Sequence, residues 1–166
     1  MLILDSKHNK FSFLLTSLRE KAKYQYNLTN EAANSIFTDD CVLKLSKKTK
    51  RIREIERNGK LIFMLRPNNG FLVAQVEGAR LLLKYSPSPN NRVVIYTDYS
   101  EMVAEGRNLF AKHVKNLDSR IKTGSEVIVV NEDDELIAVG KSLLNHKEML
   151  DLNYGIGVKV RRGVKK

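Results

Sequence analysis

Hydrophobic residues at the start of the chain recur with the spacing of an amphipathic helix. Phe11, Leu14, Leu15, Leu18 and Ala22 fall on one side of such a helix, and the positions between them are largely polar or charged. A shorter helix follows over residues 31–37, where a Thr or Asn at 29–30 can accept from the free amides of the first turn. The chain is therefore predicted to begin with two helices between residues 11 and 37.

The pattern then changes to short β-prone runs. We predict strands over residues 42–46, 51–57, 60–66 and 71–76. Asn58-Gly59 can adopt the positive φ angles of a two-residue hairpin turn, and Pro67 to Gly70 marks a longer turn. Residues 77–85 return to a helical pattern. This part of the chain is expected to be an antiparallel meander with helices at both ends.

A segment rich in Pro, Ser and Asn at residues 86–91 breaks regular structure and marks a domain boundary. Beyond it we predict strands over 93–97, 108–114, 126–130, 135–141 and 157–162, and short helices over 100–105 and 145–152. Short connections favour closure of these strands into a small barrel.

The predicted class is α+β in two domains. Residues 1–87 form an α+β module, residues 92–163 form a β pseudobarrel with two short helices, and 164–166 are a frayed basic tail.

Composition narrows the possible functions. The 166 residues carry a net charge of +10, which attracts polyanions, nucleic acid first among them. The single cysteine, Cys41, excludes an internal disulfide and a cysteine-built zinc site, and it favours a reducing compartment. The N-terminus shows neither a signal-peptide core nor a membrane span. We expect a cytoplasmic protein without membrane contact.

Signatures of catalysis are missing from the sequence. There is no phosphate-binding glycine loop and no paired-histidine zinc helix, and the three histidines are scattered over separate elements. The carboxylate pairs Asp39-Asp40 and Asp133-Asp134 fall in predicted turns, where solvated aspartates are expected. We therefore predict no catalytic residue, no metal site and no cofactor.

Basic residues form two clusters. The final strand and the tail contain Lys159, Arg161, Arg162 and Lys165, and alternation places Lys159 and Arg161 on one face with Val160 pointing inward. Such a patch can neutralise several phosphates. The other cluster lies in the first domain, where RNA binding and a simply solvated face are equally open. Its candidate residues are Lys47, Lys48, Lys50, Arg51 and Arg53.

A further candidate begins at Gly106, which can take the left-handed conformation that ends a short helix and turns the chain into a strand. In that strand Asn108, Phe110 and Lys112 would share one face. An amide, an aromatic ring and a cation suit hydrogen bonding, base stacking and phosphate contact. A phenylalanine at such a position is more often a core residue than a stacking platform, and the sequence alone does not choose between the two for Phe110.

Three ordered blocks, Glu105 to Val114, Gly124 to Gly140 and Gly155 to Gly163, together resemble a PUA domain. The likeness is greatest to the C-terminal domain of archaeal tRNA-guanine transglycosylases. It continues upstream, where residues 18–26 and 49–79 are similar to the module that precedes the PUA domain in those enzymes.

This resemblance implies a pseudobarrel that binds structured RNA, with tRNA and its acceptor end as the expected target. The contact positions that it implies in this sequence are Gly106, Arg107, Asn108, Lys112, Lys159, Arg161 and Arg162. The catalytic barrel of that family has no counterpart here. The expected function is non-catalytic RNA binding in tRNA modification, with a separately encoded transglycosylase as a candidate partner. The alternative is a ribosome- or rRNA-associated adaptor.

Overall fold

The computed structural model describes residues 1–166, which divide into two compact units, Met1–Ser86 (unit 1) and Pro87–Lys166 (unit 2). Each unit has its own sheet and its own helices, as the predicted α+β class requires. The predicted fold class is therefore confirmed.

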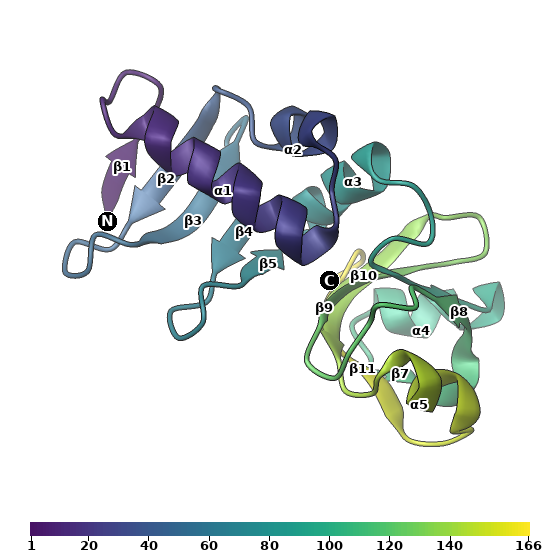
Figure 1. Ribbon diagram of the computed structural model, residues 1–166. Helices are drawn as coiled ribbons and strands as arrows, with labels where there is room; N and C mark the ends of the chain where they lie inside the picture. The colour runs from purple at the N-terminus through teal and green to yellow at the C-terminus, as the bar shows by residue number, and fades with distance from the viewer. The chain divides into compact units, whose positions relative to one another are not determined.

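Unit 1 is a five-stranded antiparallel sheet with the order β1-β2-β3-β4-β5, and Figure 1 shows its longest helix, α1, lying across one face. The elements in chain order are β1 (Leu2–Leu4), α1 (Phe11–Tyr26), α2 (Asn30–Ile36), β2 (Cys41–Leu45), β3 (Ile52–Arg57), β4 (Lys60–Leu65), β5 (Leu72–Ala74) and α3 (Val76–Tyr85).

Local sequence explains most of these elements. Leu15, Leu18 and Ala22 are buried on the inner face of α1, as their spacing predicts. The Thr29 side chain caps α2 by accepting from the Ala32 amide. Asn58 and Gly59 have φ angles of 53° and 72°, the positive values that the hairpin between β3 and β4 needs.

The strand β1 was missing from the sequence-based prediction. Its three residues pair antiparallel with the outer edge of β2, from Leu2 opposite Leu45 to Leu4 opposite Leu43. Three apolar residues are too few to show a period of two, so only the pairing with β2 identifies this strand.

Unit 2 is a six-stranded sheet with the order β7-β11-β10-β9-β6-β8, and Figure 1 shows its strands curling around an interior. Its core includes Val93, Leu109, Val129, Ala138 and Val158. The elements in chain order are β6 (Arg92–Ile95), the 3-10 turn η1 (Thr97–Tyr99), α4 (Ser100–Ala104), β7 (Leu109–Phe110), the 3-10 turn η2 (Ala111–His113), β8 (Val114–Leu117), β9 (Glu126–Val130), β10 (Leu136–Ser142), α5 (His146–Asp151) and β11 (Ile156–Gly163).

The single strand predicted over 108–114 is wrong. The chain instead forms β7, the turn η2 and β8, and β7 pairs with β11 whereas β8 pairs with β6. The two strands are nearly consecutive in the chain but lie at opposite ends of the sheet order. The turn η2 therefore connects the two edges, and the sheet has to curl for both pairings to exist.

The predicted frayed tail also needs correction. The Val164 amide donates to the Ile137 carbonyl, and the Lys165 amide donates to the Ala104 carbonyl, both at 3.0 Å. Val164 packs against the core of unit 2 as well. These contacts hold the start of the tail against the barrel.

Candidate nucleic-acid interface

The turn after α4 and the end of β11 lie directly against each other. Gly106 has a φ of 97° and its amide closes the last turn of α4 on the Val103 carbonyl. Gly163, the last residue of β11, is packed so closely that a Cβ there would lie 1.9 Å from the Ala104 carbonyl oxygen. Only glycine fits at residue 163 without moving one of the two segments. The turn at Gly106 and the final strand, the two candidate surfaces of this domain, thus adjoin.

Asn108 helps to form this junction. Its side-chain oxygen accepts a hydrogen bond from the Val160 amide of β11 at 3.0 Å, just before a bulge in the pairing of β11 with β10. That oxygen is therefore engaged within the fold. The Asn108 side chain positions β11 and retains its amide group as a donor toward solvent or a ligand.

Aromatic rings form a small cluster beside the turn. Phe110 is 41% exposed, so it is not a fully buried core residue. Its ring meets the edge of the His113 ring at 6.4 Å between centroids, and His113 in turn stacks on Tyr99 at 3.5 Å. Burial, and then the charge of Lys112, lower the pKa of His113. A neutral imidazole thus supports an exposed ring that is available for stacking.

The cations of the predicted site fall into two groups. Arg161 donates to the carboxylate of Glu126 at 2.8 Å, Lys165 pairs with Glu101, and Arg162 donates to the carbonyl of Lys166. By contrast, the side chains of Arg107, Lys112 and Lys159 make no hydrogen bond or ion pair. The second group has no internal carboxylate to displace before a phosphate binds.

Lys141 is a residue that the sequence analysis missed. It lies on β10 directly opposite Lys159 on β11, and both side chains are exposed. Like charges directly opposite each other on neighbouring strands repel and are destabilising, so this pair concentrates positive charge beside Lys159. The signal could not be seen in the sequence, because it depends on the register of β11 against β10.

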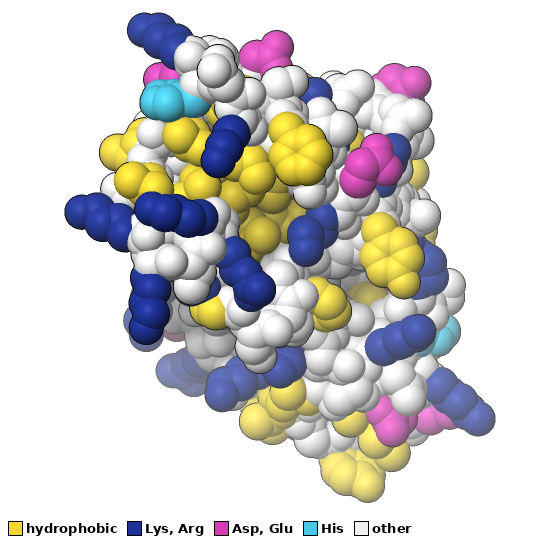
Figure 2. Space-filling model, turned by 60° about the vertical axis from the view of Figure 1, so that its left-hand side comes forward, with side chains coloured by type: hydrophobic (Ala, Val, Ile, Leu, Met, Phe, Trp, Pro, Cys, Tyr) yellow, Lys and Arg dark blue, Asp and Glu magenta, His cyan; other side chains and the backbone are white.

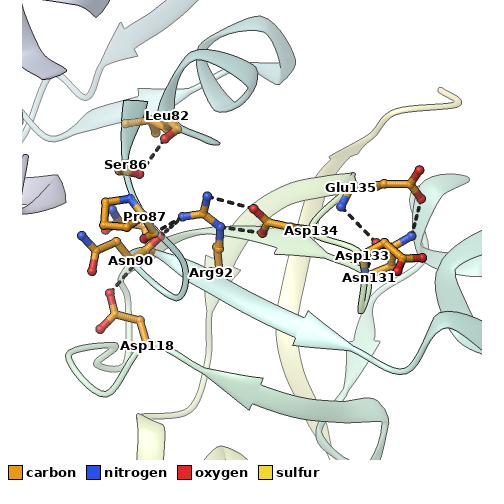
Figure 3. A network of polar contacts seen from close by, with 11 residues as sticks. Leu82, Ser86, Pro87, Asn90, Arg92, Asp118, Asn131, Asp133, Asp134 and Glu135 are labelled. Atoms are coloured by element: carbon orange, nitrogen blue, oxygen red, sulfur yellow. Dashed lines mark hydrogen bonds and ion pairs between the residues drawn. The ribbon is translucent and has the colours of Figure 1, made fainter. Parts of the chain in front are cut away.

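Another polar network lies at the start of unit 2 (Figure 3). The Arg92 guanidinium, with 1% of its side chain exposed, donates to both carboxylate oxygens of Asp134, at 2.7 and 3.1 Å. It also donates to the carbonyls of Pro87 and Asn90. Asp134 was expected to be a solvated turn residue. It lies in that turn with 43% of its side chain exposed, and it is also part of the scaffold, because a buried guanidinium requires an anionic partner.

Asp118 extends this scaffold by accepting from the Asn91 amide at 2.7 Å. Burial alone would raise the pKa of Asp118, but hydrogen bonds from Asn91 and Arg120 outweigh it and hold the pKa below the ordinary value. The carboxylate thus fixes the turn from which β6 begins.

The basic cluster of unit 1 is only partly neutralised. Lys44 lies between Glu54 and Glu56, and Arg57 lies beside Asp40. The five predicted candidates, which lie on the turn between β2 and β3 or at the start of β3, make no side-chain hydrogen bond or ion pair. They are Lys47, Lys48, Lys50, Arg51 and Arg53.

The structure shows no group of three or more His, Cys, Asp or Glu side chains that could hold a metal ion. Cys41 is buried, and burial raises the pKa of its thiol. None of the helices has both the length and the apolar character that crossing a membrane requires.

Two family models match consecutive parts of this chain. Residues 91–164 match the PUA domain, and residues 16–89 match the patch-forming domain C2 of tRNA-guanine transglycosylase. Residues 91–164 are therefore a PUA domain and residues 16–89 a patch-forming C2 domain, and the resemblance noted from the sequence is confirmed. Since the PUA domain is an RNA-binding domain, the chain carries an RNA-binding module.

Curated relatives locate the similarity within a larger protein. The chain is 39% identical over 165 residues to the tRNA-guanine(15) transglycosylase of Methanocaldococcus jannaschii, a match that covers 96% of this chain and 24% of the relative. It is 41% identical over 145 residues to the enzyme of the same name from Thermococcus kodakarensis, covering 87% and 24%. The chain thus spans about a quarter of the length of these relatives.

Solved structures support the fold. A hypothetical protein of Pyrococcus horikoshii aligns with a TM-score of 0.74 at 21% identity, covering 99% of this chain and 95% of that one. A conserved PUA domain protein from Thermoplasma acidophilum aligns with a TM-score of 0.58 at 20% identity, covering 87% and 89%. At this level of identity the likeness concerns architecture only.

Proposed function

We propose that this chain is a non-catalytic RNA-binding protein that binds the acceptor end of tRNA during tRNA modification. The observation that carries the proposal is the junction of the Gly106 turn with β11 in the PUA domain. The segment that carries Arg107 and Phe110 is joined there to β11, the strand that carries Lys159. Arg107 and Lys159 make no hydrogen bond or ion pair, and Phe110 is 41% exposed. Cations without internal partners bind phosphates, and an exposed ring stacks on an unpaired base.

The second part of the proposal is an accessory role. The two domains that match this chain occur, in the relatives, within proteins named as transglycosylases, and the match is to about a quarter of their length. We infer that a separately encoded catalytic chain performs the base exchange while this chain holds the RNA.

Binding to intact tRNA and to tRNA truncated at the acceptor end, each over a series of salt concentrations, tests the first part. Intact tRNA should bind more tightly at every salt concentration, and both affinities should fall as salt rises. Equal affinity for the two RNAs, or for any polyanion, would contradict acceptor-end binding.

Co-purification from cells tests the accessory role. Recovery of a transglycosylase that lacks these two domains would support it. Sedimentation with ribosomal subunits would instead favour an rRNA-associated adaptor, and base exchange by the purified chain alone would show that it is an enzyme.

A further inference from the structure

A groove of about 500 Å³ lies wholly within unit 1, between α1 and two turns. Leu14, Ser17, Leu18 and Lys21 of α1 form one wall. The turn that joins β2 to β3, with the start of β3, contributes residues 50–53. The end of β4, with the turn that joins it to β5, contributes residues 65–70. Figure 2 shows this hollow with hydrophobic side chains at its floor and Lys and Arg side chains around it.

The groove combines an apolar floor with a basic rim. Leu14, Ile52 and Leu65 are only partly buried, so they present hydrophobic surface to solvent. Five cations line the same groove, and no Asp or Glu does. They are Lys21, Lys50, Arg51, Arg53 and Arg66.

Four of these cations have no internal partner. The side chains of Lys21, Lys50, Arg51 and Arg53 make no hydrogen bond or ion pair, although carboxylates neutralise the neighbouring Lys44. Lys21 reaches across the groove, since a Cβ on Gly70 would lie 2.9 Å from its ammonium nitrogen. Several like charges converging on one hollow create a local positive potential that attracts an anion.

We propose that this groove binds an unpaired nucleotide of RNA together with its flanking phosphates. A base can rest on the apolar floor and stack on a guanidinium plane, while the phosphates on either side meet the rim. A duplex keeps its bases stacked inside and presents phosphates alone, so it cannot use the floor. The inference rests on the proposed RNA-binding function and adds a second site in the other unit.

Fluorescence anisotropy with the full chain tests this site. The probe is a single-stranded RNA of about five nucleotides, the length that a small binding surface covers. Its comparators are an abasic strand with the same number of phosphates and a blunt duplex of the same length. The intact strand should bind more tightly than either comparator, because only it offers a base to the floor.

Paired variants locate the binding. The Arg51→Gln/Arg53→Gln double variant should weaken binding of the single strand by about tenfold. The matched control is Lys122→Gln/Lys147→Gln, which removes the same charge at two exposed lysines that do not line the groove and belong to no candidate site. The control should change the affinity by no more than about twofold. Circular dichroism melting should be the same for all three proteins, because these side chains are without structural partners.

Three results would overturn the proposal: equal affinity for the intact and abasic strands, equal loss in the two double variants, or tighter binding of an acidic, leucine-containing peptide than of RNA. A preference for intact over acceptor-truncated tRNA, without groove binding of the short strand, would refute this site and leave the proposed function standing. Groove binding of the short strand without any preference for intact tRNA would refute the acceptor-end function and leave this site standing.

Discussion

The basic residues of unit 1 and unit 2 differ in what neutralises them. In unit 2, Asp134, Glu126 and Glu101 engage Arg92, Arg161 and Lys165, so part of the positive charge is held in internal ion pairs. In the groove of unit 1, four cations converge with no carboxylate among the lining residues. The number of basic residues in a segment is therefore a poor guide to its binding surface.

Basic residues of the same type therefore differ in role, some contributing to stability and others to binding. A cation that is paired with a buried carboxylate contributes to stability, and its removal leaves a desolvated charge behind. A cation with no partner contributes little to stability but remains available to a phosphate. Substitutions in the two classes should therefore affect folding and binding separately.

The largest expected effect is on folding, from Arg92→Ala. Arg92 is 1% exposed and donates to Asp134 and to two carbonyls, so its loss leaves several acceptors unpaired. We expect unit 2 to lose about 3 kcal/mol of stability, at the low end for a buried pair because Asp134 is partly exposed. Urea unfolding followed by circular dichroism measures this. The control is Arg107→Ala, since Arg107 is exposed and unpaired. An equal loss of stability in the two variants would contradict the distinction between paired and unpaired cations.

Arg161→Ala should come next. The resemblance implies that Arg161 contacts RNA, but its partner Glu126 has only 2% of its side chain exposed, so the substitution should also affect folding. Leaving that carboxylate without Arg161 should cost about 1 to 3 kcal/mol. The free energies of unfolding of the wild type, Arg161→Ala, Glu126→Gln and the double variant form a double-mutant cycle. The double variant should be more stable than additivity predicts, whereas additive losses would mean that the pair is not coupled.

Lys159→Gln should affect binding alone. Removing one unpaired cation should lower the slope of log affinity against log salt by about one, with no loss of stability. Because Lys159 lies opposite Lys141, the substitution should even relieve a small repulsion between like charges. Filter binding of tRNA over a salt series measures the slope. An unchanged slope would remove Lys159 from the interface.

Local signals in the sequence were sufficient for most elements of the fold. The helical spacing in α1, the Thr29 cap and the Asn58-Gly59 turn each depend on a few neighbouring residues, and the structure shows all three. The strand predicted over 108–114 failed because the break at η2 is imposed by pairing with β11 on one side and β6 on the other. The partner strand β11 lies about fifty residues further along the chain, so the local sequence does not show this pairing.

The candidate site was less predictable for the same reason. Charge and aromatic residues can be counted in the sequence, but the pairing of Arg161 with Glu126 requires the register of distant strands. The groove in unit 1 likewise requires α1 to lie beside two turns that are remote in sequence. Sequence reasoning therefore identified the basic residues but could not separate those that are neutralised from those that are available.

The smallest expected effect concerns an exposed pair. Hydrogen bonds from Lys115, then from the amide and hydroxyl of Thr97, lower the pKa of Glu132 from 4.5 to about 2. A carboxyl group whose pKa is lower in the folded state contributes stability above its unfolded pKa and loses that contribution as the pH falls. Wild-type unit 2 should therefore lose stability between pH 4.5 and about 2 more steeply than the Glu132→Gln variant. Melting temperatures over this range, measured for both proteins, would show parallel curves if Lys115 and Thr97 did not hold the carboxylate.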